Sequence, residues 1–346
     1  MLTVSKRLHL LTIVATAFLA AAFVGSIAAG AALADGGGHQ WESNETPPTL
    51  NGDWAALNRC PVDNPTMLAA DTTTNLALCV GVSSPGGSFT IGGLTLPTKA
   101  SDLQLGVVLN QTDGSATPIS PSGGALVNES IEVPNGLVTL ICPSHGHLAW
   151  QVCRPQHNGR YNEHSGELTN LTISMEAAGE PSNFNLFAGL SLNQPIISLP
   201  VKIHLENRLL GDRCYLGSNA EPIVLQTENT TEPTVAFDAF DANGTPDPNG
   251  TMTLIALLGT QASSSFAVPA ATGCGFRGMF DEAIDGHMGL PSPAGKNSLV
   301  LNEAKTDLVL VSSPGSTDGQ ELATAWHSAV QPEENQGHRH GHGHGH

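Results

Sequence analysis

The sequence predicts a mainly β protein, an antiparallel sandwich or barrel made of two β-rich units that disulfides hold together. Three observations favour this fold class. Glycine and proline number 38 and 23 among 346 residues, roughly 18 % against an average of about 12 %. Short apolar segments rich in Val, Leu, Ile and Thr are separated by turn residues. Six cysteines all follow an N-terminal segment typical of exported proteins, whose destination permits disulfides.

The N-terminal segment has the layout of a secretory signal peptide. Lys6 and Arg7 form a short basic region, residues 8–33 are apolar, and an A-x-A cleavage pattern ends at Ala34. We expect cleavage there, which leaves no membrane-spanning segment. The alternative is an uncleaved anchor, because the apolar stretch of 26 residues is long enough to cross a bilayer.

Apolar segments bounded by Gly, Pro, Asn and Asp continue through the chain. We expect strands at 76–82, 88–91, 103–109, 126–133, 137–141, 168–174, 196–205, 223–227, 234–237, 251–258, 264–268 and 298–311. Short helices are expected at 64–70 and 278–285, although neither has a strong 3.6-residue pattern.

The predicted domain boundaries follow from the composition and from a weak internal sequence repeat. The motif LTLPTK at 94–99 resembles ISLPVK at 197–202, which suggests a duplicated β unit with a boundary near residue 180; chance in a Leu- and Pro-rich chain is the alternative. The resulting plan is a signal peptide at 1–34, a flexible linker at 35–58, β-rich domains at 59–180 and 181–312, and a disordered His-rich tail at 313–346.

The charge balance is strongly acidic. Removing residues 1–34 moves the formal net charge from −18 to −20, because that segment holds two bases and no acid. Phosphate recognition needs clustered Lys and Arg, so nucleic acid is excluded as a partner and anionic membrane surfaces are disfavoured. The excess of acid favours solubility.

Six cysteines permit 15 pairings. We expect nearest-neighbour disulfides, which would each lie within one supersecondary unit: Cys60–Cys79, Cys142–Cys153 and Cys214–Cys274. The alternative is a set of metal-bound thiolates. The sequence has no C-x-x-C pair, and the export segment argues against reduced thiols.

Two histidine patches are candidate metal sites for Zn, Cu or Ni. On a strand, His145 and His147 would face the same side, and His157 or His164 could supply a third ligand. The alternative is a polar surface hairpin with solvated histidines. In the tail, histidines alternate with glycine or arginine at His338, His340, His342, His344 and His346. Purification tags are usually unbroken histidine runs, so the alternation favours native sequence.

The remaining motifs are weaker evidence for a functional site. Asp238, Asp241, Asn243 and Asp247 offer oxygen ligands that suit Ca²⁺, but the EF-hand spacing fails and an acidic turn is favoured. Residues 289–297 fail the phosphate-loop spacing. The sequence has neither G-x-S-x-G nor H-E-x-x-H, and we assign no catalytic residue. The lack of these motifs favours a non-catalytic role, and an enzyme whose catalytic residues are dispersed in the sequence is the alternative.

The sequence contains the short motifs CPVD at 60–63, LPVK at 199–202, DRCYLGS at 212–218, GCGF at 273–276 and GLPSPAGKN at 289–297. Together these motifs resemble uncharacterised exported proteins of actinobacteria. The resemblance implies secretion, implies no catalytic residue, and does not extend to the His-rich tail.

We therefore expect a secreted, non-catalytic protein, extracellular or associated with the cell envelope, that acts in structure or binding with a partner there. One alternative is binding or buffering of divalent metals through the tail. A second is a metal-dependent hydrolase around His145 and His147.

Overall fold

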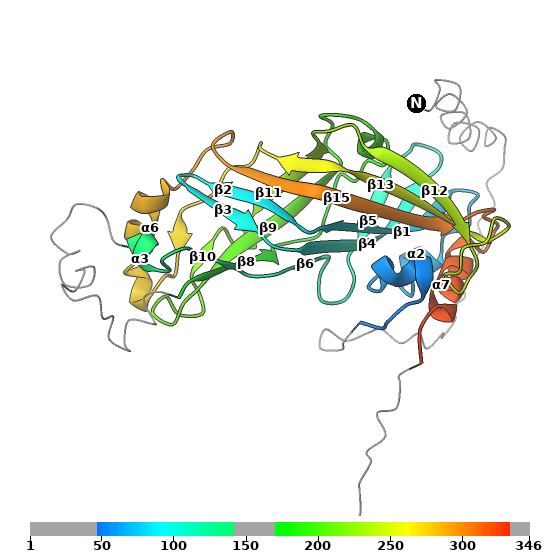
Figure 1. Cartoon of the computed structure of the whole chain (residues 1–346), viewed down its shortest axis with the longest axis horizontal. Helices are drawn as coiled ribbons and strands as arrows, with labels where there is room; N and C mark the ends of the chain where they lie inside the picture. Colours follow the sequence, from blue (N-terminus) through cyan, green and yellow to red (C-terminus); the bar gives the residue numbers. More distant parts are fainter. Residues whose placement is uncertain (1–46, 142–169, 333–346) are drawn as a thin grey trace, which may run out of the picture.

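The computed structural model describes residues 47–141 and 170–332, which form one large, curled antiparallel sheet (Figure 1). The main path through its 15 strands runs β14-β10-β9-β11-β13-β15-β1-β4-β5. The strands are β1 (Asn75–Ser84), β2 (Gly86–Ile91), β3 (Leu94–Thr98), β4 (Ser101–Asn110), β5 (Ala116–Ile119), β6 (Leu126–Asn128), β7 (Ile131–Glu132), β8 (Thr172–Ala177), β9 (Ile197–Glu206), β10 (Tyr215–Leu216), β11 (Ile223–Asn229), β12 (Thr234–Phe240), β13 (Met252–Ser263), β14 (Ala271–Thr272) and β15 (Ser298–Val311).

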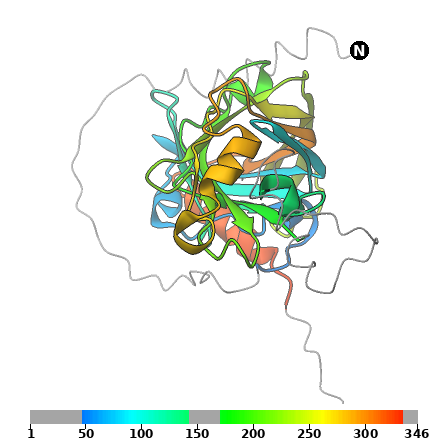
Figure 2. The same ribbon diagram turned by 90° about the vertical axis from the view of Figure 1, so that its left-hand side faces the viewer.

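Short helices flank the sheet at both ends (Figure 1). Helices α3 (Val138–Ile141) and α6 (Asp281–Met288) lie at one end, and α2 (Pro65–Leu68) and α7 (Asp318–Ser328) lie at the other. The other helical segments of the described chain are η1 (Gly52–Leu57), η3 (Ala188–Leu190) and η4 (Phe276–Gly278). Seen from the end that carries α6, the sheet curls around its own interior (Figure 2). No helix within the described ranges is long and apolar enough to span a membrane.

Strand β15 organises the sheet. It pairs with β13 on one side and, on the other, with β1 through residues 305–309 and with β2 through residues 298–302. Strand β11 joins the two parts of the sheet, because residues 223–227 pair with β9 and residues 228–229 pair with β13.

A single side chain joins β6 to β8 where the sheet curls back. The Asn128 Nδ2 atom donates to the Met175 carbonyl at 2.6 Å, and the Met175 N–H donates to Asn128 Oδ1 at 3.2 Å. The asparagine amide thus replaces the backbone ladder that would otherwise continue the sheet.

Two apolar cores lie on opposite faces of the central strands. Leu78 and Val80 of β1 face the interior of the curl, whereas the alternate residues Ala77 and Cys79 face a second core. The second core lies between the outer face of the sheet and the helices η1, α2 and α7, and contains the fully buried Trp326.

The fold class is confirmed, with β strands dominating, but several local predictions are wrong. Residues 138–141 form helix α3 instead of a strand; Leu137 and Leu140 are both fully buried, and a three-residue separation places them on one helical face. Residues 264–268 form no regular strand, since only an isolated bridge joins Val268 to Ser292. Strands β3, β5, β10 and β14 were not predicted.

The expected linker and tail are both shorter than the domain plan states. Within the linker, residues 47–58 are ordered, because Trp54 and Leu57 are fully buried in the second core. Within the tail, α7 packs against the same core through Leu322 and Trp326. Near the expected domain boundary at residue 180, β8 pairs with β9, so the sheet continues across it.

Candidate ligand-binding cavity

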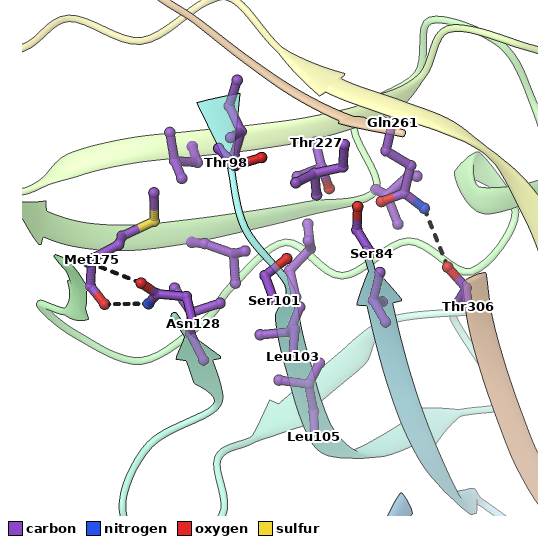
Figure 3. A pocket seen from close by; sticks show the side chains of 18 of the residues that line it. Ser84, Thr98, Ser101, Leu103, Leu105, Asn128, Met175, Thr227, Gln261 and Thr306 are labelled. Carbon is purple, nitrogen blue, oxygen red and sulfur yellow. Dashed lines mark hydrogen bonds between the residues drawn. The ribbon is translucent and has the colours of Figure 1, made fainter. Parts of the chain in front are cut away.

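A cavity of about 100 Å³ lies inside the curl of the sheet (Figure 3). Its wall comes from β1, β2, β3, β4, β6, β7, β8, β9, β11, β13 and β15. Strand alternation produces this wall, because every second side chain of a strand points the same way. On β13, for example, Leu257 lines the cavity, whereas the adjacent Leu258 points outward and is 50 % exposed.

Most of the lining is aliphatic or aromatic, as an apolar ligand requires. Buried apolar residues of the wall include Val80, Phe89, Leu103, Leu105, Ile173, Leu199, Leu225, Leu257, Leu299 and Leu308.

Uncharged polar side chains are set into this apolar wall. Gln261 Nε2 donates to Thr306 Oγ1 at 3.2 Å, and both residues are buried. Thr227 is also buried, and Thr98 Oγ1 is a buried atom without a hydrogen-bond partner among the described residues. Ser84 differs from them, because its hydroxyl is already bonded to backbone carbonyls.

A β-bulge in β15 lets residues on both sides of it line the cavity. Leu301 and Thr306 both line it, although an odd separation would put them on opposite faces of a regular strand. The pairing of β13 with β15 shifts register between Gly259 and Gln261. Across from this shift, Glu303 has a φ of 48°, in the left-handed region that residues other than glycine seldom adopt.

The charged residues of the lining are confined to its rim. Lys99 and Glu129 are the charged members of the lining within the described chain, and both are exposed. Ser101 and Asn128 lie near them in sequence and also line the cavity, so the polar junction between β6 and β8 belongs to the same wall. The interior therefore offers apolar contact and neutral hydrogen-bonding groups.

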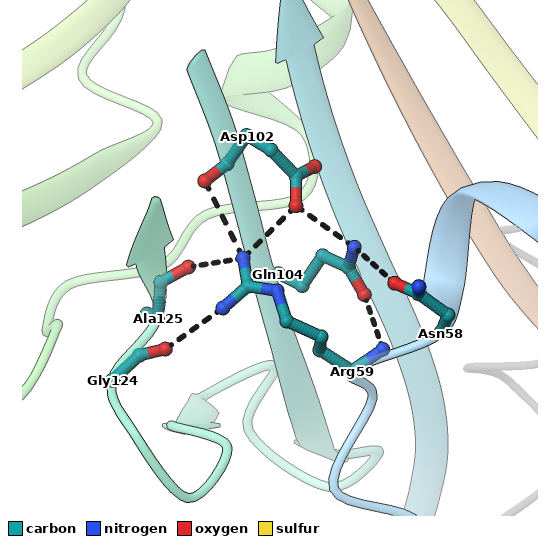
Figure 4. Close-up of polar contacts among 6 residues, drawn as sticks. All are labelled: Asn58, Arg59, Asp102, Gln104, Gly124 and Ala125. Carbon is teal, nitrogen blue, oxygen red and sulfur yellow. Dashed lines mark hydrogen bonds and ion pairs between the residues drawn. The ribbon is translucent and has the colours of Figure 1, made fainter. Parts of the chain in front are cut away.

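An arginine-centred network holds the outer face of β4, whose inner face lines the cavity (Figure 4). The Arg59 guanidinium donates to Asp102 Oδ2 at 2.9 Å and to the carbonyl oxygens of Gly124 and Ala125 at 3.0 and 3.1 Å. Gln104 Oε1 accepts from the Arg59 N–H at 2.7 Å. These bonds fix the segment before α2 and the loop before β6 onto one strand.

The predicted site residues fall into two groups. The Cys60–Cys79 and Cys214–Cys274 disulfides are present as expected. Cys142, Cys153, His145, His147, His157 and His164, together with the tail histidines, lie outside the described residues. Within the described ranges, no group of three or more His, Cys, Asp or Glu side chains is placed to hold a metal ion.

The acidic segment forms a turn between β12 and β13. Asp241 Oδ1 accepts from the N–H groups of Asn243 and Thr245 at 2.9 Å each, and Asp247 Oδ1 accepts from that of Asn249 at the same distance. This is the hydrogen bonding of the acidic turn that the sequence favoured.

Comparison of the chain with protein-family models, with curated proteins and with solved structures finds no match in any of the three. The cavity is therefore the candidate site, although no sequence pattern marks its residues as one.

The tail supports a separate prediction from its sequence. We expect the five alternating histidines to bind Zn²⁺ or Cu²⁺ with a Kd of about micromolar and to lose the metal below about pH 6, where imidazole protonates. Titration calorimetry on the full chain and on a chain ending at residue 332 would measure this. Equal binding by both chains, or none by the full chain, would contradict it.

Proposed function

We propose that the protein is a non-catalytic binding protein that holds an apolar ligand inside its curled sheet. The observation that carries this proposal is the cavity, which is walled by apolar side chains from ten strands and has its charged lining residues confined to the rim. Concave, mainly apolar sites with a few polar groups are the usual form of a small-molecule site.

The size of the cavity sets the kind of ligand that fits it. At about 100 Å³ it is comparable to an engineered protein cavity of about 150 Å³ that binds benzene. A ring or short alkyl segment that buries roughly 200 Å² of apolar surface would gain about 5 kcal/mol. That gain corresponds to a Kd of roughly 0.2 mM, and longer ligands would extend through the rim.

The proposal includes a location outside the cytoplasm, in the cell envelope or beyond it. Two disulfides and the N-terminal signal-like segment support this location, because disulfides persist in oxidising compartments.

Filling the cavity is the direct test. We expect Leu257→Trp to weaken toluene binding at least tenfold, because the indole occupies the ligand's volume; tenfold is about 1.4 kcal/mol. Leu258→Trp is the matched control, since the same change on the adjacent, outward-facing residue leaves the cavity empty. Ligand-observed NMR and calorimetry measure the binding, and thermal melting shows that each variant is folded.

Val82→Phe, at another lining residue, replaces Leu257→Trp if the latter does not fold. An organic extract of the purified protein, analysed by mass spectrometry, would show whether an apolar molecule is retained. If wild-type protein binds neither toluene nor another apolar probe and its extract is empty, the proposed function is wrong.

A further inference from the structure

The cavity contains a hydrogen-bonding group that the protein leaves available. Gln261 on β13 is 7 % exposed, and its Nε2 atom is bonded to Thr306 on the neighbouring strand. Its Oε1 atom accepts no hydrogen bond within the described chain and points into the cavity, away from Thr306 (Figure 3). An amide oxygen that faces a mainly apolar cavity without a donor is the natural partner for a ligand group.

Two hydroxyl side chains extend this polar part of the wall. Thr98 Oγ1 is buried and has no partner among the described residues, and Thr227 is 6 % exposed. Both line the same cavity as Gln261. A threonine hydroxyl can donate or accept, whereas the free Gln261 oxygen can only accept.

The β-bulge of β15 lies beside the hydrogen-bonded pair Gln261 and Thr306. Thr306, which accepts from the Gln261 amide, and Leu301, which pairs with Gln261, both face the cavity because of the register shift beside Glu303. A residue other than glycine with a φ of 48° costs about 1 kcal/mol or more, and bulges are frequent beside functional sites, where they redirect side chains.

We propose that the ligand is an alcohol: an uncharged hydroxyl group on an apolar body, which donates its hydrogen bond to Gln261 Oε1. The proposal rests on the proposed function and specifies the ligand class of that site. A hydroxyl fits because it supplies the donor that Gln261 lacks and can also bond to Thr98 or Thr227.

A carboxylate does not fit the interior. The charged lining residues Lys99 and Glu129 lie at the exposed rim, so an inserted carboxylate would have no cation beside it. Burial of an unpaired charge is far more costly than burial of a hydroxyl that gains a hydrogen bond. An alkane or plain arene would fill the apolar part and leave Gln261 Oε1 unpaired.

The test uses three probes that share one ring: toluene, benzyl alcohol and benzoate. We expect wild-type protein to bind benzyl alcohol at least as tightly as toluene, and both more tightly than benzoate. In Gln261→Leu, the ratio of benzyl alcohol affinity to toluene affinity should fall about tenfold, the value of one buried hydrogen bond. Toluene binding itself should be unchanged or tighter.

Gln226→Leu is the matched control, because Gln226 is exposed on the outer face of β11, between two lining residues. It should leave the affinity ratio unchanged. Gln261→Met is the second variant if Gln261→Leu does not fold, since it keeps the length of the side chain and removes the amide.

The outcomes separate this inference from the proposed function. If toluene binds but the ratio stays the same in Gln261→Leu, the alcohol assignment is wrong and the apolar site stands. If benzoate binds most tightly and Lys99→Gln abolishes that preference, the polar group of the ligand lies at the rim and the assignment is also overturned. If toluene does not bind at all, both proposals fail.

Discussion

Removing the Cys214–Cys274 disulfide by replacing both residues with alanine is expected to lower the free energy of unfolding by about 4 kcal/mol. The bond closes a loop with a sequence separation of 60. In the chain-entropy model, closing a loop of this length lowers the entropy of the unfolded chain and so stabilises the folded protein by that amount. Both cysteines are also fully buried in the core that surrounds the cavity. Urea unfolding measured by tryptophan fluorescence would determine the loss.

The other described disulfide provides the matched comparison. Cys60–Cys79 has a sequence separation of 19, for which the same model gives about 3 kcal/mol when both cysteines become alanine. The two variants should therefore rank by loop length. A larger loss from the Cys60–Cys79 pair would show that native packing around the cysteines, rather than restriction of the unfolded chain, sets the stability.

The second large effect concerns Asp318 at the start of α7. Its side chain is fully buried, and its Oδ2 atom accepts from the Ala77 N–H of β1 at 2.7 Å. Burial raises the pKa of Asp318 to about 6, and the negative charges of Glu321 and Asp71 add to the increase, while the Ala77 bond opposes it. The ionised carboxylate is thus destabilising in the folded state.

The sign of the pH dependence follows from this raised pKa. Between the unfolded pKa of about 4 and the folded pKa of about 6, the folded protein binds more protons, so this group favours folding at low pH. Its destabilising effect grows as the pH rises and reaches about 3 kcal/mol above pH 6. Asp318→Asn cannot ionise, so its stability relative to wild type should improve by about that amount between pH 4 and pH 7.5.

Urea unfolding at both pH values measures this difference. Asp113→Asn is a suitable control, because hydrogen bonds from Ser115 lower the pKa of the exposed Asp113. The stability of Asp113→Asn relative to wild type should fall as the pH rises from 4 to 7.5. The reason is that a carboxylate whose pKa is lowered by folding stabilises the folded protein above the unfolded pKa, and the variant lacks that carboxylate. A relative stability of Asp318→Asn that does not depend on pH would refute the assignment.

The sequence is informative about strands and less so about the ends of the ordered chain. Apolar segments between turn residues located most of the long strands, including all of β15. Strand β3 was missed because Pro97, which lies within it, reads as a strand breaker. Helix α7 was missed because its buried positions, such as Leu322 and Trp326, lie among Gly, Ser and Thr in a short segment next to the His-rich tail.

The cavity could not be predicted from the sequence. On β1, Leu78 faces the cavity-side core and Cys79 faces the helix-covered core, yet both are buried, so alternation does not reveal which face is which. Leu301 and Thr306 face the same cavity because of the bulge beside Glu303, and no sequence pattern marks that bulge. Nothing in the sequence distinguishes Gln261 from other polar strand residues, because the curl of the sheet is what brings it into the cavity wall.

The central position of β15 has a consequence for the order of events during synthesis. Among the described strands β1 is the first to leave the ribosome and its partner β15 is the last, with Cys79 paired to Val309. The two edges of β1 are therefore not both paired until residues 305–309 have been translated. Because this pairing joins distant parts of the chain, we expect the sheet to close late, after the other described strands have been made.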